Sequence, residues 1–385
     1  MSERITLDNW DDGGALSRYA YQHTAEIFPA AVISSGTATA PLQLVPDPRI
    51  GNWILGEDDR GAVTLDRHVA RSLADGLIVV HRGRIVHETY PRMMPDAPHL
   101  LFSVSKVFVG TLIALLEDRG LVALEATAAS YLPRLMGTDW ADVNVRDLLE
   151  MAAGMEGAEA GAAAYTDPLD HNYMLEASLG WLQKDPRHPD TVRAGDTWGY
   201  IADLRRIEAP GTRRVYTSVN TMILAGIVEA VTGKPLARVL SDELVRRMGA
   251  QHDALIAVSP QGLPIAAAGM QMTLRDLARF GLLFTPSWTE VAREPVIPPS
   301  VLARMQTEGR PELFGAAPGD WRRHGAYQWD AVTRDGDLIK GGFGNQMLFI
   351  SPSRDLVVAW VGVNGARADD IDVDLPLQRM VEELF

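Results

Sequence analysis

The chain has 385 residues, of which 46% are hydrophobic and 22% charged, a composition typical of a soluble globular protein with roughly two or three structural units. Its net charge of −14 argues against nucleic acids and anionic membranes as partners, because both attract basic surfaces. The absence of cysteine excludes disulfides, thiolate nucleophiles and cysteine metal sites. No apolar run approaches transmembrane length and the N-terminus shows no export signal, so we expect a cytoplasmic protein.

Hydrophobic periodicity and turn residues divide the chain into a wrap, a helical middle and a strand-rich end. Residues 1–60 carry scattered glycines and prolines and predict an extended wrap with little regular structure. The helices expected from apolar spacing and from glycine or proline stops are 64–75, 104–118, 121–131, 143–154, 221–232, 236–248 and 273–281. The strands expected from β-rich runs are 76–81, 84–90, 325–329, 347–350 and 356–361.

Strands near both ends of a mostly helical chain predict an α+β fold, an α/β sandwich. We expect one antiparallel sheet that is built from both chain ends and flanked by helices, with a mainly helical domain inserted. The sheet domain would comprise 1–106 and 260–385, the inserted domain 107–259, and the active site would lie at their interface. Within the inserted domain, 156–200 has no clear period, and a long irregular segment is usually a lid or a binding loop.

The first candidate for chemistry is the S-x-x-K tetrad formed by Ser103 and Lys106, at the start of an apolar helix. Residues three apart share one helix face, so a neutral lysine there can take the serine proton. Burial against Phe102 and Phe108 would lower the pKa of the lysine. Alone, the tetrad fits equally well an N-cap serine beside a lysine whose charge reaches solvent.

Two further motifs follow in the chain. Tyr216-Thr217-Ser218 supplies a phenol that could pass the serine proton to a leaving group, although a core tyrosine would fit as well. Lys340-Gly341-Gly342-Phe343 precedes a strand, and its glycines let the backbone approach a ligand closely. The Phe343 N–H could then be an oxyanion donor and Lys340 could add positive charge, unless the motif is an ordinary glycine-rich strand entry.

The order of these motifs resembles that of the serine β-lactamase and penicillin-binding-protein superfamily, in its class C-like branch. Within that branch the chain is most similar to the 6-aminohexanoate-dimer (nylon-oligomer) hydrolases and their carboxylesterase relatives. The segments that carry this likeness are Leu7–Trp10, Phe102–Lys106, Tyr165–Pro168, Tyr216–Asn220 and Ile227–Gly233. The chain departs from the pattern in having Ser218 where the branch has asparagine, and in having Lys340 where esterases often have histidine or tryptophan.

The resemblance implies a role for each matching residue. Ser103 would be the acylated nucleophile, Lys106 its base partner and Tyr216 the proton shuttle, with the Ser103 and Phe343 N–H groups as oxyanion hole. Tyr165 would be a lid tyrosine on the substrate amide. Glu176 lies near a family aspartate that binds the substrate amine. The residues expected to contact substrate are Tyr165, Ser218, Glu176 and Trp181, and those expected in the third motif are Lys340, Gly342 and Phe343.

The sequence therefore predicts a serine hydrolase of small esters or amides that needs no metal or organic cofactor. An acyltransferase that uses the same acyl-enzyme, and a catalytically silent binding protein on the same fold, are the alternatives. His81 and His87 could be imagined as a metal pair, but the sequence offers no third ligand for them. A homodimer is compatible with the sequence.

Overall fold

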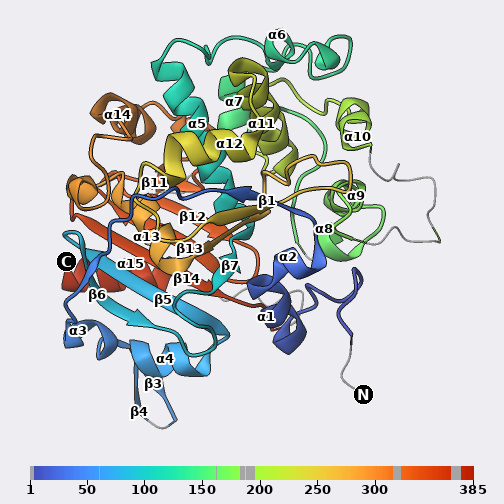
Figure 1. Cartoon of the computed structure of the whole chain (residues 1–385). Coiled ribbons are helices and arrows are strands. Elements are labelled where there is room, and N and C mark those ends of the chain that lie inside the picture. The colour runs from blue at the N-terminus through green and yellow to red at the C-terminus, as the bar shows by residue number, and fades with distance from the viewer. Residues whose placement is uncertain are drawn as a thin grey trace.

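The computed structural model describes residues 4–59, 61–161, 163–182, 187, 196–314, 322–365 and 374–385. Strands from both chain ends form an eight-stranded sheet in the order β10-β11-β12-β13-β14-β5-β6-β2 (Figure 1). All neighbours pair antiparallel except β2 with β6. The strands are β2 Gln43–Leu44, β5 Ala74–His81, β6 Arg84–Thr89, β10 Arg322–His324, β11 Ala331–Thr333, β12 Leu338–Gly342, β13 Gln346–Ser351 and β14 Leu356–Gly362. The predicted α+β fold is thereby confirmed.

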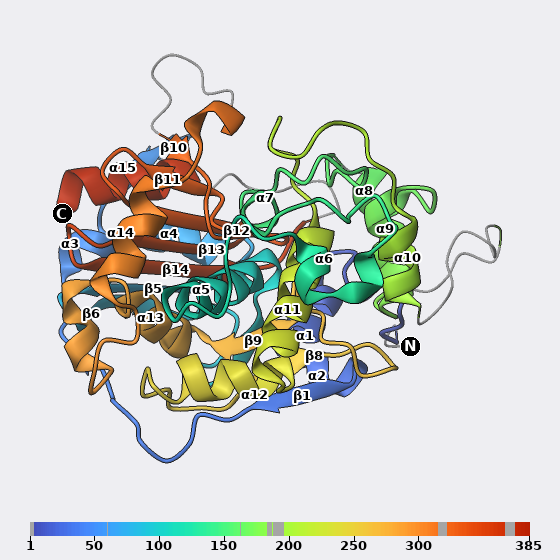
Figure 2. The same ribbon diagram turned by 90° about the horizontal axis from the view of Figure 1, so that it is seen from above.

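Both faces of this sheet are buried, because alternate residues of each strand enter two different cores. On β5, Ile78 and Val80 belong to the main core, whereas Leu77 and Val79 belong to a smaller second core. Helices α5 and α13 supply residues to the main core, and α4 and α15 to the second. Figure 2 shows the sheet between these two groups of helices.

Most of the helices lie in the middle of the chain, as predicted, and gather above the sheet in Figure 1. The helices are α1 Gly14–Gln22, α2 Thr24–Ile27, α3 Pro48–Gly51, α4 Leu65–Arg71, α5 Ser105–Asp118, α6 Ala128–Tyr131, α7 Val145–Leu149, α8 Ala163–Thr166, α9 His171–Ser178, α10 Thr197–Asp203, α11 Ser218–Thr232, α12 Leu236–Leu240, α13 Leu274–Leu282, α14 Pro299–Thr307 and α15 Asp374–Leu384. No helix among the described residues is long and apolar enough to cross a membrane.

The local stop signals in the sequence act as expected at the two longest helices. Gly233 ends α11 with a φ of 66°, and Gly120 follows α5 with a φ of 70°. Glycine adopts this left-handed conformation without steric cost, and its N–H then closes the last turn. The predicted helices 104–118, 221–232 and 273–281 and the predicted hairpin around Gly83 are all confirmed.

The prediction of little regular structure in residues 1–60 is wrong. Helix α1 and strand β1, Ala30–Ile33, are well formed, and β1 is the edge of a second sheet of order β1-β8-β9-β7. Its other strands are β7 Pro98–Leu100, β8 Ala254–Ala257 and β9 Met270–Thr273, and a separate hairpin joins β3 Ile54–Asp58 to β4 Gly61–Thr64. Because β1 pairs with β8, more than 200 residues away, its short apolar run carries no local signal.

The predicted strand 325–329 is also wrong. Tyr327 and Gln328 have φ values of 48° and 72°, which no strand tolerates. This apolar loop packs directly on α5, where a Cβ on Gly110 would lie 2.0 Å from the Tyr327 carbonyl oxygen. The Gln328 side chain donates to the carbonyl oxygen of Leu148. The loop is therefore held by tertiary contacts rather than by backbone hydrogen bonds to a neighbouring strand.

Several predicted helices are shorter than expected. Helix α4 ends at Arg71 because Ala74 already begins β5, and α7 ends at Leu149 because Met151 has a φ of 58°. In 121–131 only Ala128–Tyr131 is α-helical. In 236–248, α12 ends at Leu240 and a π-helix, Ser241–Val245, continues it. The segment 156–200 contains α8, α9 and α10, and its residues 162, 183–186 and 188–195 lie outside the described part.

Candidate active site

Strand β7 leads directly into the turn that carries Ser103. The turn is a single 3₁₀ turn, Phe102–Val104, and Phe102 has a left-handed φ of 44°. Helix α5 begins two residues after Ser103 and continues its direction, so Lys106 returns to the same face. Lys106 Nζ lies 2.9 Å from Ser103 Oγ. Ser103 and Lys106 therefore lie side by side, as their spacing in the sequence predicts.

The Lys106 amino group is completely buried and is surrounded by neutral oxygen atoms. Besides Ser103 Oγ, it lies 3.0 Å from Ser218 Oγ and 3.0 Å from the carbonyl oxygen of Ala267. Three acceptors satisfy all three hydrogens of an ammonium group. When the group loses a proton, its lone pair can face the Ser103 hydroxyl and accept from it.

Burial lowers the pKa of Lys106 to about 8. The charge of Lys340 acts in the same direction, and the carboxylates of Glu159, Asp330 and Glu176 oppose the shift. A lysine with this pKa is about one-tenth neutral at pH 7, compared with well under a thousandth for an ordinary lysine. Lys106 can therefore act as a base near neutral pH without any change of structure.

Tyr216 lies between two lysine side chains. It sits just before α11, where Thr217 caps the helix by accepting from the Val219 N–H. The centre of its ring is 5.0 Å from Lys106 Nζ and 4.7 Å from Lys340 Nζ. Lys340 Nζ donates to the Tyr216 hydroxyl oxygen over 3.0 Å. The phenol thus contacts both sequence motifs that contain lysine.

The Tyr216 phenol is held in its protonated form. Burial, and then the carboxylates of Asp330 and Glu159, raise the pKa of Tyr216 well above its usual value, while a hydrogen bond with Ser103 opposes this. A phenol that stays protonated cannot be the resting base. It can relay a proton between Ser103 and a leaving group, because its hydroxyl both donates and accepts.

Lys340 is a second completely buried lysine, but it has a carboxylate partner. It lies on β12, and its Nζ is 2.7 Å from Asp330 Oδ1. Burial opposes ionisation of Asp330, but Lys340, Arg214 and the Gly341 N–H outweigh it and lower the Asp330 pKa. Burial lowers the pKa of Lys340 as well, and the Asp330 carboxylate opposes that shift. Contact with an ionised carboxylate favours the charged lysine.

The end of β12 approaches the Ser103 turn so closely that only glycine fits. A Cβ on Gly342 would lie 2.8 Å from the Leu101 carbonyl oxygen and 3.1 Å from the Ser103 nitrogen. Phe343 follows directly, and its ring lies 5.3 Å from that of Phe102. The backbones of the first and third motifs therefore meet where two N–H groups could face one oxyanion. Lys340 precedes the predicted strand 347–350, which is part of β13, but it lies within β12, a strand that was not predicted.

The residues expected to contact substrate fall into three groups. Tyr165 on α8 packs its ring 4.9 Å from that of Phe343 and so lies beside the third motif. The carboxylate of Glu176 on α9 raises the pKa of Lys106, more weakly than those of Glu159 and Asp330. Ser218 instead places its hydroxyl on Lys106 and holds that lysine. Trp181 is 1% exposed and packs in the core against Trp10 and Phe102, which is the position of a structural residue.

Two carboxylates of the site were missed by sequence reasoning. Glu159 accepts from the Ser218 N–H with a carboxylate oxygen, while its own N–H donates to the Tyr216 carbonyl oxygen over 2.9 Å. Asp330 binds Lys340, as described above. A buried lysine needs a partner, but Asp330, Asp335 and Asp337 are all near Lys340 in sequence, and nothing there selects the first.

No group of three or more His, Asp or Glu side chains that could hold a metal ion occurs in the described part of the chain. His87 lies 3.1 Å from Asp66, and the ring of His81 packs against that of Phe385.

Comparison with known proteins gives one matching family and several relatives. The sequence model of the family described as Beta-lactamase matches residues 62–372. The 6-aminohexanoate-dimer hydrolase of Paenarthrobacter ureafaciens is 28% identical over 92% of this chain and 86% of its own length. A Bacillus anthracis protein assigned as a 6-aminohexanoate-dimer hydrolase has a TM-score of 0.85 at 21% identity, covering 100% of this chain and 97% of that one. A family VIII carboxylesterase has a TM-score of 0.55 at 16% identity, covering 81% and 92%.

Proposed function

This chain belongs to the beta-lactamase family, and we propose that it is a serine hydrolase that cleaves a small ester or linear amide through an acyl-enzyme on Ser103. The observation that carries the proposal is the contact of Lys106 Nζ with Ser103 Oγ over 2.9 Å, in a pocket of neutral oxygen atoms. There the lysine has a pKa of about 8 and can take the serine proton.

The proposed cycle uses only groups of this chain. Neutral Lys106 accepts the Ser103 proton as Ser103 Oγ attacks the carbonyl carbon, and the resulting oxyanion lies between the Ser103 and Phe343 N–H groups. Tyr216, which contacts both Ser103 and Lys340, donates its hydroxyl proton to the departing alcohol or amine as the C–O or C–N bond breaks. The proton that Lys106 took from Ser103 then replaces it on the phenol, so both groups return to their starting states. The acyl group stays on Ser103 until water, activated by the same Lys106–Tyr216 pair, attacks it and releases the acid.

Two residues of the helical segment are proposed as substrate contacts. Tyr165 lies beside Phe343, where its hydroxyl could bind the scissile ester or amide. The Glu176 carboxylate is close enough to act on the Lys106 charge and would meet the part of the substrate that extends toward α9. In this proposal Ser103, Lys106, Lys340 and Phe343 come from the sheet part, 1–106 and 260–385. Tyr165, Glu176 and Tyr216 come from the helical part, 107–259.

The names of the relatives support both an ester and an amide as substrate. One relative is a 6-aminohexanoate-dimer hydrolase and one structural neighbour is a carboxylesterase. Hydrolysis of an ester and of an amide proceeds through the same acyl-enzyme. The two reactions differ chiefly in the leaving group that Tyr216 must protonate, an alcohol or an amine. The substrate panel should therefore pair an ester and an amide that share one acyl group.

The proposal is tested by intact-protein mass spectrometry after short incubation with p-nitrophenyl butyrate, alongside nitrophenol release, for the wild type and for Ser103→Ala. We expect turnover or a butyryl adduct in the wild type and neither in Ser103→Ala, with both chains folded. Transfer of the butyryl group from Ser103 to an added alcohol, in place of hydrolysis, would indicate an acyltransferase. Neither turnover nor adduct with the ester or with the matching butyryl anilide would favour a silent binding protein.

A further inference from the structure

Helix α1 lies before the part of the chain that the family model matches, yet it contacts both turns of the proposed oxyanion hole. The contact is made by Tyr21, which is completely buried. Its ring is 4.8 Å from that of Phe102, the residue before Ser103, with an interplanar angle of 77°. A Cβ on Gly344, the residue after Phe343, would lie 3.2 Å from Tyr21 Cε2. One ring therefore touches both turns.

The Ser103 turn requires support of this kind. Phe102 has a φ of 44°, a left-handed conformation that a bulky side chain adopts only when its surroundings impose it. Its ring is enclosed by the rings of Tyr21, Trp10 and Phe343. The direction of the Ser103 N–H depends on this backbone conformation. Any loosening of the aromatic contacts would turn that N–H away from the oxyanion.

The Phe343 turn is braced from the same side. The Tyr21 hydroxyl bonds to Asn364 Oδ1 over 3.2 Å, and the Asn364 carbonyl oxygen accepts from the Gly14 N–H at the start of α1. Asn345, which has a φ of 66°, donates from Nδ2 to the Val363 carbonyl oxygen. Helix α1, the end of β14 and the turn after Phe343 are thus linked by hydrogen bonds.

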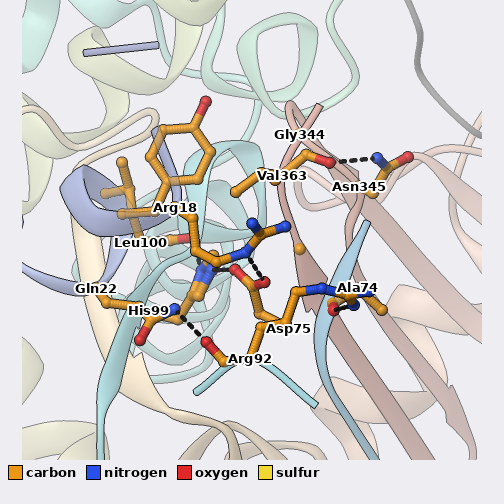
Figure 3. A network of polar contacts seen from close by, with 12 residues as sticks. Arg18, Gln22, Ala74, Asp75, Arg92, His99, Leu100, Gly344, Asn345 and Val363 are labelled. Atoms are coloured by element: carbon orange, nitrogen blue, oxygen red, sulfur yellow. Dashed lines mark hydrogen bonds and ion pairs between the residues drawn. The ribbon is translucent and has the colours of Figure 1, made fainter. Parts of the chain in front are cut away.

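A buried ionic cluster fixes the position of α1. Arg18 lies three residues before Tyr21 and so on the same helix face, and its Nε is 2.5 Å from Asp75 Oδ1. His99 Nε2 is 3.3 Å from the other oxygen of Asp75, and both Asp75 and His99 are completely buried (Figure 3). His99 is on β7, four residues before Ser103. The cluster ties α1 to the strand that delivers the nucleophile.

We propose that Tyr21 is a positioning residue of the active site, which holds the Ser103 and Phe343 turns at the separation that an oxyanion requires. This inference rests on the proposed function. It assigns a part in catalysis to helix α1, which lies before the residues 62–372 that the family model matches. Tyr21 touches no reacting atom, so its effect should fall on the transition state and not on ground-state binding.

The experiment compares Tyr21→Leu, Tyr21→Phe and Phe349→Leu with the wild type. Tyr21→Leu removes the ring that contacts Phe102 and Gly344, and Tyr21→Phe removes only the hydroxyl. Phe349→Leu removes a buried ring from the second core, on the opposite face of the sheet. For each chain the melting temperature, kcat and KM for p-nitrophenyl butyrate, and the Kd of phenylboronic acid are measured. Phenylboronic acid forms a tetrahedral adduct with a catalytic serine and so probes the oxyanion hole.

We expect Tyr21→Leu to lower kcat about thirtyfold, to weaken the binding of phenylboronic acid by a similar factor and to leave KM within about twofold. Loss of a whole oxyanion donor costs about a hundredfold or more, and a displaced donor should cost somewhat less. Tyr21→Phe should retain most of the activity, and Phe349→Leu should lower the melting temperature without affecting kcat. Should Tyr21→Leu not fold, Arg18→Lys loosens the same helix with less damage and should show a smaller fall of the same pattern.

Equal kcat and boronic-acid affinity in folded Tyr21→Leu and Phe349→Leu, or in Arg18→Lys and the wild type, would overturn the positioning role. A wild-type chain that neither turns over nor binds phenylboronic acid would remove the proposed function, and this inference with it.

Discussion

Lys106 and Lys340 are both completely buried and both lie about 5 Å from the ring of Tyr216, yet their surroundings differ in one respect. The oxygen atoms in contact with Lys106 are two hydroxyls and a carbonyl, all neutral. The oxygen atom in contact with Lys340, apart from that of Tyr216, belongs to the carboxylate of Asp330. The two lysines are therefore equally buried, but Lys106 contacts only neutral oxygen atoms whereas Lys340 contacts a negatively charged one.

This difference separates a base from a fixed charge. A neutral environment lets burial lower the pKa of Lys106 to about 8, so that the lysine exchanges protons in the working range. A carboxylate at 2.7 Å keeps Lys340 in its charged form, where it can orient Tyr216 and stabilise negative charge. In this arrangement Lys106 can act as the base and Lys340 as a fixed positive charge, on either side of the Tyr216 phenol.

The largest effect should come from making the same substitution at both lysines. Arginine does not lose its proton in proteins, so Lys106→Arg should lower kcat/KM about a thousandfold, within the range for loss of a general base. Lys340→Arg keeps a positive charge beside Asp330 and should stay within about tenfold of the wild type. Steady-state hydrolysis of p-nitrophenyl butyrate measures both.

Lys234→Arg is the matched control, because Lys234 lies at the surface beside Asp242 and should tolerate the change. Equal losses at 106 and 340 would mean that the two lysines do not have separate roles.

Removing the phenol between the lysines should give the next largest effect. Tyr216→Phe keeps the ring near both amino groups but takes away the hydroxyl that contacts Ser103 and Lys340, and we expect acylation to slow at least about a hundredfold. Stopped-flow release of nitrophenol measures the step. Tyr327→Phe is the control, since Tyr327 is also buried but donates to Glu117. An unchanged rate in Tyr216→Phe would remove the proton-relay role.

A more selective change makes the surroundings of Lys340 resemble those of Lys106. Asp330→Asn keeps the shape of the side chain and one of its two acceptor oxygens, but removes the charge that opposes the lowering of the Lys340 pKa. Lys340 must be charged and Lys106 neutral for turnover, so the rise of kcat/KM with pH should now be followed by a fall. We expect about a tenfold loss at pH 9, where the wild type should be at its plateau.

A pH–rate profile from 6 to 10 tests this, with Asp337→Asn as control for the loss of a buried carboxylate that pairs with an arginine elsewhere on the sheet. A flat plateau in Asp330→Asn would show that the Lys340 charge does not depend on Asp330.

The sequence predicts one lysine of this pair much better than the other. Ser103 and Lys106 are one helical turn apart, so their contact follows from local geometry. Tyr216 and Lys340 are 124 residues apart, and only the resemblance to a family brought them together in advance. The role of Lys340 depends on Asp330, which lies in a loop that was predicted to be a strand up to residue 329, and sequence alone could not aim that carboxylate at the lysine.

The same distinction applies to the fold. Helix α11 and the hairpin β13–β14 were predictable because period and turn residues are local. Strand β1 was missed because its partner β8 lies far along the chain, and α1 was missed because its burial comes from Phe102, Gly344 and Asp75. Long-range contacts decide both, and no window of the sequence contains them.

The smallest expected effect concerns the distant charges that tune Lys106. Its pKa is set by burial and by four charged groups that face it, the carboxylates Glu159, Asp330 and Glu176 and the ammonium of Lys340. Among them Glu159 acts most strongly, and its carboxylate raises the Lys106 pKa. Glu159→Gln keeps an acceptor for the Ser218 N–H and removes only the charge. The inflection of kcat/KM near pH 8 should therefore move to lower pH.

At pH 6, below the inflection, the rate is proportional to the neutral fraction of Lys106, so Glu159→Gln should be about threefold faster than the wild type. At pH 9 the two should be equal, because Lys106 is mostly neutral in both. Glu229→Gln is the control, since that carboxylate also accepts a backbone N–H, from Leu236, but does not face the site. A shift to higher pH, or an equal gain in Glu229→Gln, would mean that the inflection does not report Lys106. The wild-type profile would then need another group, and Tyr216 is excluded from that role because its pKa is raised.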